Sequence, residues 1–240
     1  MGPELNAVIS GASSAIGGAI ATAIASTGAA VWLVGRDAAR LETTAQTAKA
    51  MARAVRVYRA DLTVDSAVEE LASQIRNEFG AVDVLVHCAG AYTTGKIEST
   101  PVEELDALYK ANVRLPFMLT QSLLPLLKKR SGQIVFINSS QALRSGATTS
   151  LYAATKHALK ALADGLRQEV NAEGIRVLSL YPGRTATATM KALYLTEGRN
   201  YQPELLLQAG DVAQMVMASL QLPRTAEVTD LEIRPLVKSY

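Results

Sequence analysis

Residues 6–17 read Asn6-Ala-Val-Ile-Ser10-Gly11-Ala-Ser-Ser-Ala-Ile-Gly17 and join a short apolar run to a turn of small residues. Asn6–Ser10 has the length and composition of a buried strand. The turn leads into a helix that we expect to end near Ser26. In such a turn an anion can approach the backbone closely, because free N–H groups at the start of the helix face it. The stretch therefore predicts the first unit of an α/β fold with an anion-binding turn, although a plain glycine-rich turn has the same residues.

This turn lies within 31 consecutive residues, Leu5 to Gly35, that include no Asp, Glu, Lys or Arg. An uncharged stretch of that length suggests a membrane span or a signal peptide. Serines, threonines and glycines interrupt it, so that no apolar span of about 20 residues exists, and no basic segment precedes it. A strand, a turn, a helix and a second strand explain the stretch better, and no membrane association is expected.

The composition of the whole chain is that of an ordinary globular protein. Of its 240 residues, 49% are hydrophobic and 19% are charged. The formal net charge of +2 is too small to predict nucleic-acid binding. The single cysteine, Cys88, excludes an intrachain disulfide and fits a reducing compartment. Because no linker or repeat divides the chain, we expect one domain over residues 1–240. Because no targeting segment is recognised, we expect a cytoplasmic location.

Short runs rich in Val and Ile alternate with longer segments of helical periodicity. The predicted strands are Asn6–Ser10, Ala30–Val34, Val55–Arg59, Val82–His87, Gln133–Asn138, Ile175–Leu180 and Val228–Ile233. The clearest predicted helices are Asp37–Ala52, Val64–Phe79, Glu103–Lys129 and Leu151–Asn171, and Pro116 and Pro125 are expected to kink or end the third. This alternation predicts a doubly wound parallel sheet of about seven strands with helices on both faces. A (β/α)₈ barrel is the alternative, but it needs an eighth strand and has no need of the glycine turn.

The end of the second predicted strand indicates which dinucleotide would bind. Gly35 and Arg36 follow Gly17 by 18 and 19 residues, near the place where an acidic residue would bind a ribose 2′-hydroxyl. Gly35 is not acidic, and Arg36 can bind a 2′-phosphate through charge-assisted hydrogen bonds. Asp37 either caps the helix that begins at Ala38 or binds a hydroxyl. We therefore expect NADP(H), with NAD(H) as the less favoured cofactor.

Three side chains farther along the chain suggest proton transfer. Tyr152 and Lys156 lie four residues apart, on one face of a predicted helix. A phenol with a pKa of about 10 is a poor base near neutrality, and a nearby ammonium would lower that pKa. Ser139 follows the carboxyl end of the fifth predicted strand, at the edge where doubly wound sheets bind ligands. Tyr-x-x-x-Lys alone is common by chance, but its combination with this serine and the glycine turn is rare.

Taken together, these motifs resemble those of the short-chain dehydrogenases/reductases, which are single-domain Rossmann enzymes of about this length. The resemblance covers the chain from Asn6 to the last predicted strand. Ser10–Gly17 resembles the family's Thr-Gly-x-x-x-Gly-x-Gly turn, and Asp61-Leu62 resembles the pair that contacts adenine. His87–Gly90 lies where the family has Asn-Asn-Ala-Gly, and Asn112 lies where it has an active-site asparagine. Pro182–Thr187 resembles the cofactor segment Pro-Gly-x-x-x-Thr.

The resemblance implies an oxidoreductase that transfers a hydride between NADP(H) and a small carbonyl or alcohol substrate. Tyr152 would exchange the proton of the substrate oxygen and Ser139 would bind that oxygen. Lys156 would hold the nicotinamide ribose and lower the pKa of the tyrosine, and Asn112 would position a water that leads protons toward Lys156. No metal site is expected. The implied cofactor contacts are Gly11, Ser13, Ser14, Ile16, Gly17, Arg36, Asp61, Leu62, Ala89, Gly90, Tyr152, Lys156, Pro182, Gly183, Thr185 and Thr187.

Several residues depart from the family pattern or neighbour its motifs. Ala15 replaces the middle glycine of the turn, so its Cβ is expected to press on the diphosphate or to shift the loop, and Ala15→Gly should tighten cofactor binding. His87 and Cys88 replace two asparagines; we interpret His87 as a structural substitute and Cys88 as a small core residue. His157, next to Lys156, is interpreted as a packing or surface residue.

Two other functions stay open at this point. The altered residues suggest a non-catalytic dinucleotide-binding or scaffold protein, although such a protein has no need for Asn112, Ser139, Tyr152 and Lys156 together. A sugar-nucleotide epimerase or dehydratase also has Tyr-x-x-x-Lys, but it usually carries a C-terminal substrate domain, and too few residues follow Gly183 to form one.

The sequence does not identify the substrate. Specificity is expected in 184–208, a segment that we expect to act as a lid, and Tyr92, Thr93 and Thr94 are candidates to line the substrate pocket. The predicted helices Glu103–Lys129 and Leu151–Asn171 resemble those through which the family assembles. A homodimer or homotetramer is therefore expected.

Overall fold

The computed structural model describes residues 4–237, and within them seven parallel strands form one sheet. The order of the strands across the sheet is β3-β2-β1-β4-β5-β6-β7, so the winding reverses between β1 and β4. The predicted doubly wound parallel sheet is confirmed. The strands are β1 (Asn6–Ser10), β2 (Ala30–Gly35), β3 (Ala54–Arg59), β4 (Val84–His87), β5 (Gln133–Ile137), β6 (Arg176–Pro182) and β7 (Asp230–Ile233).

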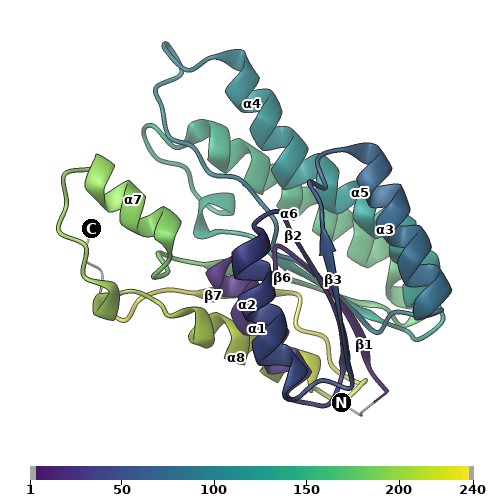
Figure 1. Cartoon of the computed structure of the whole chain (residues 1–240). Helices are drawn as coiled ribbons and strands as arrows, with labels where there is room; N and C mark the ends of the chain where they lie inside the picture. Colours follow the sequence, from purple (N-terminus) through teal and green to yellow (C-terminus); the bar gives the residue numbers. More distant parts are fainter. Residues whose placement is uncertain (1–3, 238–240) are drawn as a thin grey trace.

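Helices cover both faces of this sheet, as predicted (Figure 1). On one face lie α1 (Ala15–Ala25), α2 (Ala38–Lys49) and α8 (Ala209–Leu220), and on the other lie α3 (Asp65–Glu78), α5 (Leu115–Lys128) and α6 (Ser150–Val170). The helices α4 (Val102–Tyr109) and α7 (Ala188–Thr196) stand beyond the carboxyl edge of the sheet. Short 3₁₀ turns occupy Ser140–Ala142, Asn171–Glu173 and Pro203–Leu205.

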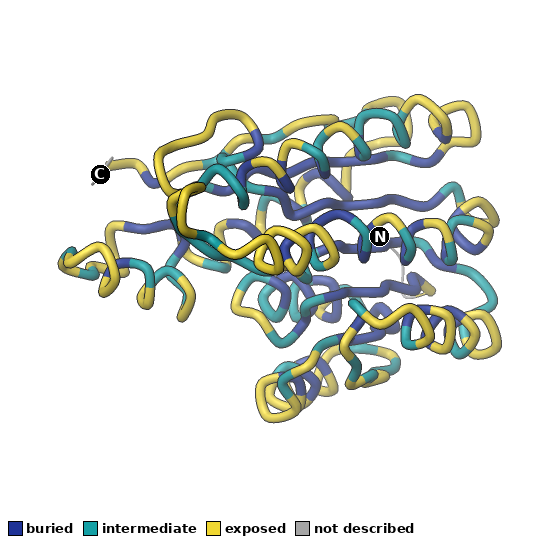
Figure 2. The backbone as a smooth tube through the Cα atoms, turned by 90° about the horizontal axis from the view of Figure 1, so that it is seen from above, coloured by how far each residue is buried: buried dark blue, intermediate teal, exposed yellow. Residues whose placement is uncertain are grey.

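The core consists of two apolar layers, one on each face of the sheet. All five residues of β1 are buried, and so are the first five of β2. Their nearly continuous apolar sequence is what a parallel strand covered on both faces requires. The edge strands β3 and β7 consist of exposed and partly buried residues, and Figure 2 shows the buried backbone concentrated in the middle of the sheet.

The predicted single helix Glu103–Lys129 is wrong in one respect. The chain forms α4, then a π-helical turn over Lys110–Arg114, then α5. Pro116 has no N–H to donate to the carbonyl four residues earlier, that of Asn112, so the regular α-helical pairing lapses there. Pro125 lies inside α5 and does not end it.

Two predicted strands begin two residues later than expected, and the strand predicted from Ile175 begins one residue later, at Arg176. The strand predicted from Val82 begins at Val84, because the Val82 N–H donates to the Leu126 carbonyl (3.2 Å) instead of to a neighbouring strand. The strand predicted from Val228 begins at Asp230. Within residues 4–237, no helix is long and apolar enough to cross a membrane.

Candidate active site

Two pockets of similar size open at the carboxyl edge of the sheet. The first, which we call the glycine-turn pocket, has a volume of about 240 Å³. The second, the tyrosine pocket, has a volume of about 230 Å³. Of the predicted site residues, the glycine-turn pocket is lined by Gly11, Ser13, Ser14, Arg36, Asp61, Leu62, Ala89 and Gly90. The tyrosine pocket is lined by Ile16, Ser139, Tyr152, Pro182, Gly183, Thr185 and Thr187.

Close approach of two loops explains the glycines of the first turn. Gly11 has a φ of +74°, and a Cβ there would lie 2.5 Å from the Ala89 nitrogen, in the loop after β4. At Gly17 a Cβ would lie 2.2 Å from the Gly11 carbonyl oxygen. The Ser14 hydroxyl caps α1 by accepting the Gly17 N–H (3.0 Å). The backbone around this turn therefore leaves no space for larger residues at either glycine.

Ala15 is the first residue of α1 and is exposed. Among residues 4–237, only Ser131 and Thr148 have a positive φ without being glycine, so Ala15 does not use the left-handed region that a glycine would open. The turn therefore accommodates an alanine in ordinary helical conformation. The expected effect of Ala15 on cofactor affinity stays a prediction.

Basic side chains gather at the far end of the glycine-turn pocket. Arg36 is 68% exposed and lies 3.7 Å from Asp61. Asp37 accepts the backbone N–H of Arg40 (3.0 Å) and its Nε–H (2.7 Å), so its interpretation as the cap of α2 is confirmed. These hydrogen bonds from Arg40 lower the pKa of the Asp37 carboxyl. Arg40 lines the pocket as well. Sequence reasoning missed it, and the only available signal was its place in the first turn of a helix that follows Arg36.

In the tyrosine pocket, Tyr152 and Ser139 face the same space from α6 and from the end of β5. Desolvation raises the pKa of Tyr152 to about 12, against the lowering effect of a hydrogen bond with Ser139. The Tyr92 ring packs edge-on against the Tyr152 ring, with 4.7 Å between the ring centroids. Tyr92 also lines the pocket, as the sequence suggested; Gln141 and Thr149, joined by a 3.0 Å hydrogen bond, line it without having been anticipated.

Lys156 lies below this pocket, with only 5% of the residue exposed. Its ammonium donates to the Ile137 carbonyl (3.4 Å) and lies 5.8 Å from the centre of the Tyr152 ring. Burial lowers the pKa of Lys156 to about 8. The pKa of Tyr152 is raised and not lowered as expected, since desolvation is the largest cause of its shift and Lys156 is not one of the causes.

Asn112 is buried in the π-helical turn and makes three hydrogen bonds. Its Oδ1 accepts the Ala91 N–H (2.8 Å), and its Nδ2 donates to the Ala91 carbonyl and to the Thr155 hydroxyl, each at 3.0 Å. A Cβ at Gly90 would lie 2.9 Å from Asn112 Oδ1 and 3.9 Å from Lys156 Nζ. Asn112 therefore ties the loop after β4 to α6 beside Lys156. Its predicted role toward a water stays a prediction.

The two residues that replace asparagines have different environments. His87 is buried, its Nε2 is 2.8 Å from the Thr120 hydroxyl, and its ring stacks on Phe136. Burial lowers the pKa of His87 to about 3, so the ring is neutral and packs as a structural group. Cys88 is partly buried: it packs against the core and also lines the glycine-turn pocket, so its assignment to the core is confirmed only in part. Desolvation raises the pKa of its thiol to about 11.

The remaining predicted residues are placed by the loop that follows β6. Thr187 caps α7, since its hydroxyl accepts the Met190 N–H (3.1 Å). The Thr185 hydroxyl donates to the Gly183 carbonyl (3.0 Å). His157 is exposed on α6, as expected for a surface residue. Over residues 4–237, no group of three or more His, Cys, Asp or Glu side chains is arranged to hold a metal ion.

Solved structures with the same fold carry a dinucleotide. An alcohol dehydrogenase from the archaeon Thermococcus sibiricus, complexed with 5-hydroxy-NADP, is 28% identical, with a TM-score of 0.87 over 98% of each chain. A short-chain dehydrogenase from Burkholderia cenocepacia in complex with NADP is 29% identical, with a TM-score of 0.83 over 96% of each chain.

Sequence comparison also finds relatives along nearly the whole chain. An uncharacterized oxidoreductase of Staphylococcus epidermidis is 34% identical over 234 residues, which are 97% of this chain and 98% of that protein. The family model described as short chain dehydrogenase matches residues 5–198. That range includes the glycine turn, the strand-end serine and the Tyr-x-x-x-Lys pair, and the chain thus belongs to the short-chain dehydrogenase family.

Proposed function

We propose that the chain is an NADP(H)-dependent oxidoreductase that interconverts a carbonyl and an alcohol, with Tyr152 as the proton donor and acceptor. The observation that carries the proposal is that the Tyr152 phenol and the Ser139 hydroxyl line one pocket, next to a glycine-turn pocket at the same edge of the sheet. The substrate oxygen would lie between these two side chains.

The residues at the two pockets fit a dinucleotide. Gly11 and Gly17 keep the turn free of side-chain atoms, and the start of α1 offers backbone N–H groups to a diphosphate. Asp61 and Leu62 would contact the adenine end, and Thr187 the nicotinamide end. When bound, the nicotinamide supplies or accepts a hydride, which none of the side chains of this protein can do.

Two arginines support a preference for the phosphorylated cofactor. Arg36 and Arg40 both line the end of the glycine-turn pocket, and a 2′-phosphate there would meet two guanidinium groups. Asp37, which otherwise favours a ribose hydroxyl, is engaged by Arg40. The solved relatives from Thermococcus sibiricus and Burkholderia cenocepacia hold 5-hydroxy-NADP and NADP.

The chain's own contribution is to move one proton. With a pKa of about 12, the Tyr152 phenol is protonated near neutrality and is suited to give its proton to the oxygen of a carbonyl that is being reduced. Ser139 would orient that oxygen. Once Tyr152 has given up its proton, the nearby Lys156 ammonium would stabilise the negative charge on the phenolate oxygen.

The test is Tyr152→Phe, assayed with a panel of ketones and aldehydes by NADPH absorbance. Removal of the proton donor is expected to lower kcat by roughly 10²- to 10⁴-fold, with a far smaller change in NADPH affinity measured by fluorescence titration. Tyr109→Phe is the matched control, because Tyr109 is 51% exposed on α4 and lines neither pocket. Unchanged turnover in Tyr152→Phe would contradict the mechanism. NADPH binding without turnover of any carbonyl would favour a non-catalytic binder.

The expected assembly and location stay predictions. We propose a homodimer or homotetramer formed through α5 and α6, where Ala161 and Gly165 line a groove beside the half-exposed Phe117. Sedimentation of the purified chain tests this. A small-molecule substrate and a cytoplasmic location belong to the same proposal.

A further inference from the structure

An ion pair lies in the wall of the tyrosine pocket. Arg184 follows β6 by two residues, and Glu197 directly follows α7. The Nη1 of Arg184 lies 3.1 Å from one Glu197 carboxylate oxygen and its Nη2 lies 3.2 Å from the other. Both side chains line the same pocket as Tyr152, with 19% and 30% of their surfaces exposed. A two-pronged contact of this kind is the geometry in which a guanidinium recognises a carboxylate.

A second guanidinium shares the same carboxylate. Arg199 lies 3.5 Å from Glu197, and the two guanidinium groups lie 4.9 and 5.3 Å from the centre of the Tyr194 ring. Two guanidinium groups therefore contact the one Glu197 carboxylate. If Arg184 bound a different anion, Glu197 would keep its contact with Arg199. The exchange would therefore not leave the Glu197 carboxylate without a cation.

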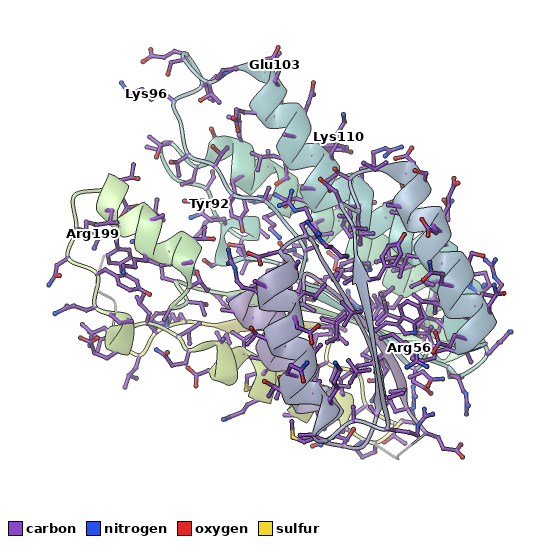
Figure 3. All side chains as sticks on the ribbon, viewed as in Figure 1. Arg56, Tyr92, Lys96, Glu103, Lys110 and Arg199 are labelled. Carbon is purple, nitrogen blue, oxygen red and sulfur yellow. The ribbon has the colours of Figure 1, made fainter. Side chains whose placement is uncertain are left out.

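Tyr92 connects this wall to the reacting end of the pocket. Desolvation and the Glu197 carboxylate raise the pKa of Tyr92, and Arg184 opposes them, so the ion pair acts on Tyr92. The ring of Tyr92 in turn packs against Tyr152. Figure 3 shows Tyr92 on the loop that faces α7, with Arg199 beyond the end of that helix. Tyr152 and Arg184 therefore line one pocket of about 230 Å³.

We infer that the substrate is a compact oxo or hydroxy acid whose carboxylate binds Arg184 in place of Glu197, while its carbonyl or hydroxyl lies at Tyr152 and Ser139. Glu197 occupies the carboxylate position when the pocket is empty and then keeps its contact with Arg199. The inference rests on the proposed function for the reaction, but its binding half is independent of turnover. The competing explanation is that the pair only fastens α7 to the loop after β6.

The experiment compares 3-oxobutanoate and its longer linear homologues with the methyl ester of each, using NADPH absorbance. Wild type is expected to prefer the acids in kcat/KM. In Arg184→Gln that preference should fall about tenfold or more, the effect of losing a charge-assisted hydrogen bond. In Glu197→Gln the KM for the acids should fall severalfold without a matching fall for the esters, because the internal competitor is removed.

Arg56→Gln is the matched control, since Arg56 also forms an ion pair, with Glu78, in a distant part of the fold (Figure 3). It should keep the wild-type preference. Equal use of acids and esters by wild type would overturn the inference. So would a loss of acid binding in Glu197→Gln, which is the result expected if the pair only fastens α7.

A binding measurement separates this inference from the proposed function. The shift in melting temperature caused by 3-hydroxybutanoate and its homologues is compared with that caused by their methyl esters, with NADP⁺ present. Stabilisation of wild type by the acids but not of Arg184→Gln supports the carboxylate site, even if no compound is turned over. Stabilisation of neither protein, or of both equally, refutes it.

Discussion

The glycine-turn pocket and the tyrosine pocket have nearly the same volume but differ in how far their ionisable groups are exposed to water. In the glycine-turn pocket, Arg36 and Asp61 are 68% and 45% exposed. Burial raises the pKa of Asp61, but hydrogen bonds from Thr63 and the charge of Arg36 outweigh it, so the net pKa is lowered. At the tyrosine pocket, desolvation moves the pKa of Tyr152 up to about 12 and that of Lys156 down to about 8.

The free-energy cost of holding ionisable groups is therefore higher at the tyrosine pocket than at the glycine-turn pocket. Exposed charges cost little to hold, and they suit an anion that arrives with its own charge. Burying an ionisable group costs free energy of folding, because its charged form loses its hydration. The glycine-turn pocket is therefore expected to be sensitive to shape, and the tyrosine pocket to pH.

The largest expected effect is that of Gly11→Ala. The new Cβ would lie 2.5 Å from the Ala89 nitrogen in a backbone with a φ of +74°, so a loss of about 2–5 kcal/mol in the free energy of unfolding is expected, together with weakened NADPH binding. Gly80→Ala is the matched control, because Gly80 has a φ of +67° and no atom within 4 Å of a Cβ. Urea denaturation measures both variants. Equal losses would show that backbone conformation, not the approach of the two loops, sets the requirement.

Next is the pH dependence of Lys156→Met. The folded pKa of about 8 lies below the unfolded value of 10.5, so the unfolded chain binds more protons between these values and wild-type stability rises with pH across that window. Below pH 8 the buried ammonium costs roughly 3 kcal/mol. The variant should therefore be more stable than wild type below pH 8, and the difference should disappear above 10.5.

Lys160→Met is the control for that experiment and has the opposite sign. The hydrogen bond that Lys160 donates to Asp164 raises the pKa of Lys160, so its contribution to stability is present below the unfolded pKa and is lost as pH rises through the folded one. Lys160→Met should therefore destabilise the protein at neutral pH. Denaturation curves from pH 7 to 10 that shift in the same direction for both variants would contradict the assignment of Lys156 as a strained buried charge.

A smaller effect is expected at the exposed charges. Arg36→Gln should weaken NADPH binding about tenfold and leave NADH binding nearly unchanged, because only NADPH carries the 2′-phosphate. Arg40→Gln should act in the same direction, and Lys49→Gln, farther along α2, should have no effect. Fluorescence titration measures all three variants. A wild type that binds NADH as tightly as NADPH would refute the role of the arginines.

The smallest expected effect is that of Ala15→Gly. The sequence suggested that glycine would tighten cofactor binding, but Ala15 begins α1 in a helical conformation and is exposed. The structure therefore predicts an NADPH affinity within about twofold of wild type and a loss of about 0.5–1 kcal/mol in helix stability. A tenfold gain in affinity would show that the alanine does press on the diphosphate.

Much of the fold could be predicted because its signals are local. A buried parallel strand needs a run such as Ala30–Gly35, and the turn after β1 needs glycine at two positions, so both are visible in a few consecutive residues. The break between α4 and α5 can be predicted only approximately. Pro116 indicates an interruption of the helix, and the pairing changes in the turn just before it, over Lys110–Arg114.

The candidate site divides in the same way. Tyr152 and Lys156 are linked by helical spacing, and Ser139 by its place at the end of a strand. No spacing connects Gln141 with Thr149 or Arg184 with Glu197, because loops between different elements bring these pairs together. The burial that moves the pKa of Lys156 also depends on elements far apart in the chain.

By itself, the sequence determined the order of strands and helices, the glycine turn and the candidate residues for proton exchange. These depend on backbone conformation and side-chain chemistry, which act over a few residues. Only the tertiary structure decided which charges are exposed and which are buried, where Arg40 lies, and that Arg184 and Glu197 meet in the wall of the tyrosine pocket. The reason is physical: desolvation and ion pairing depend on what surrounds a group in space, and most of those neighbours are distant in the chain.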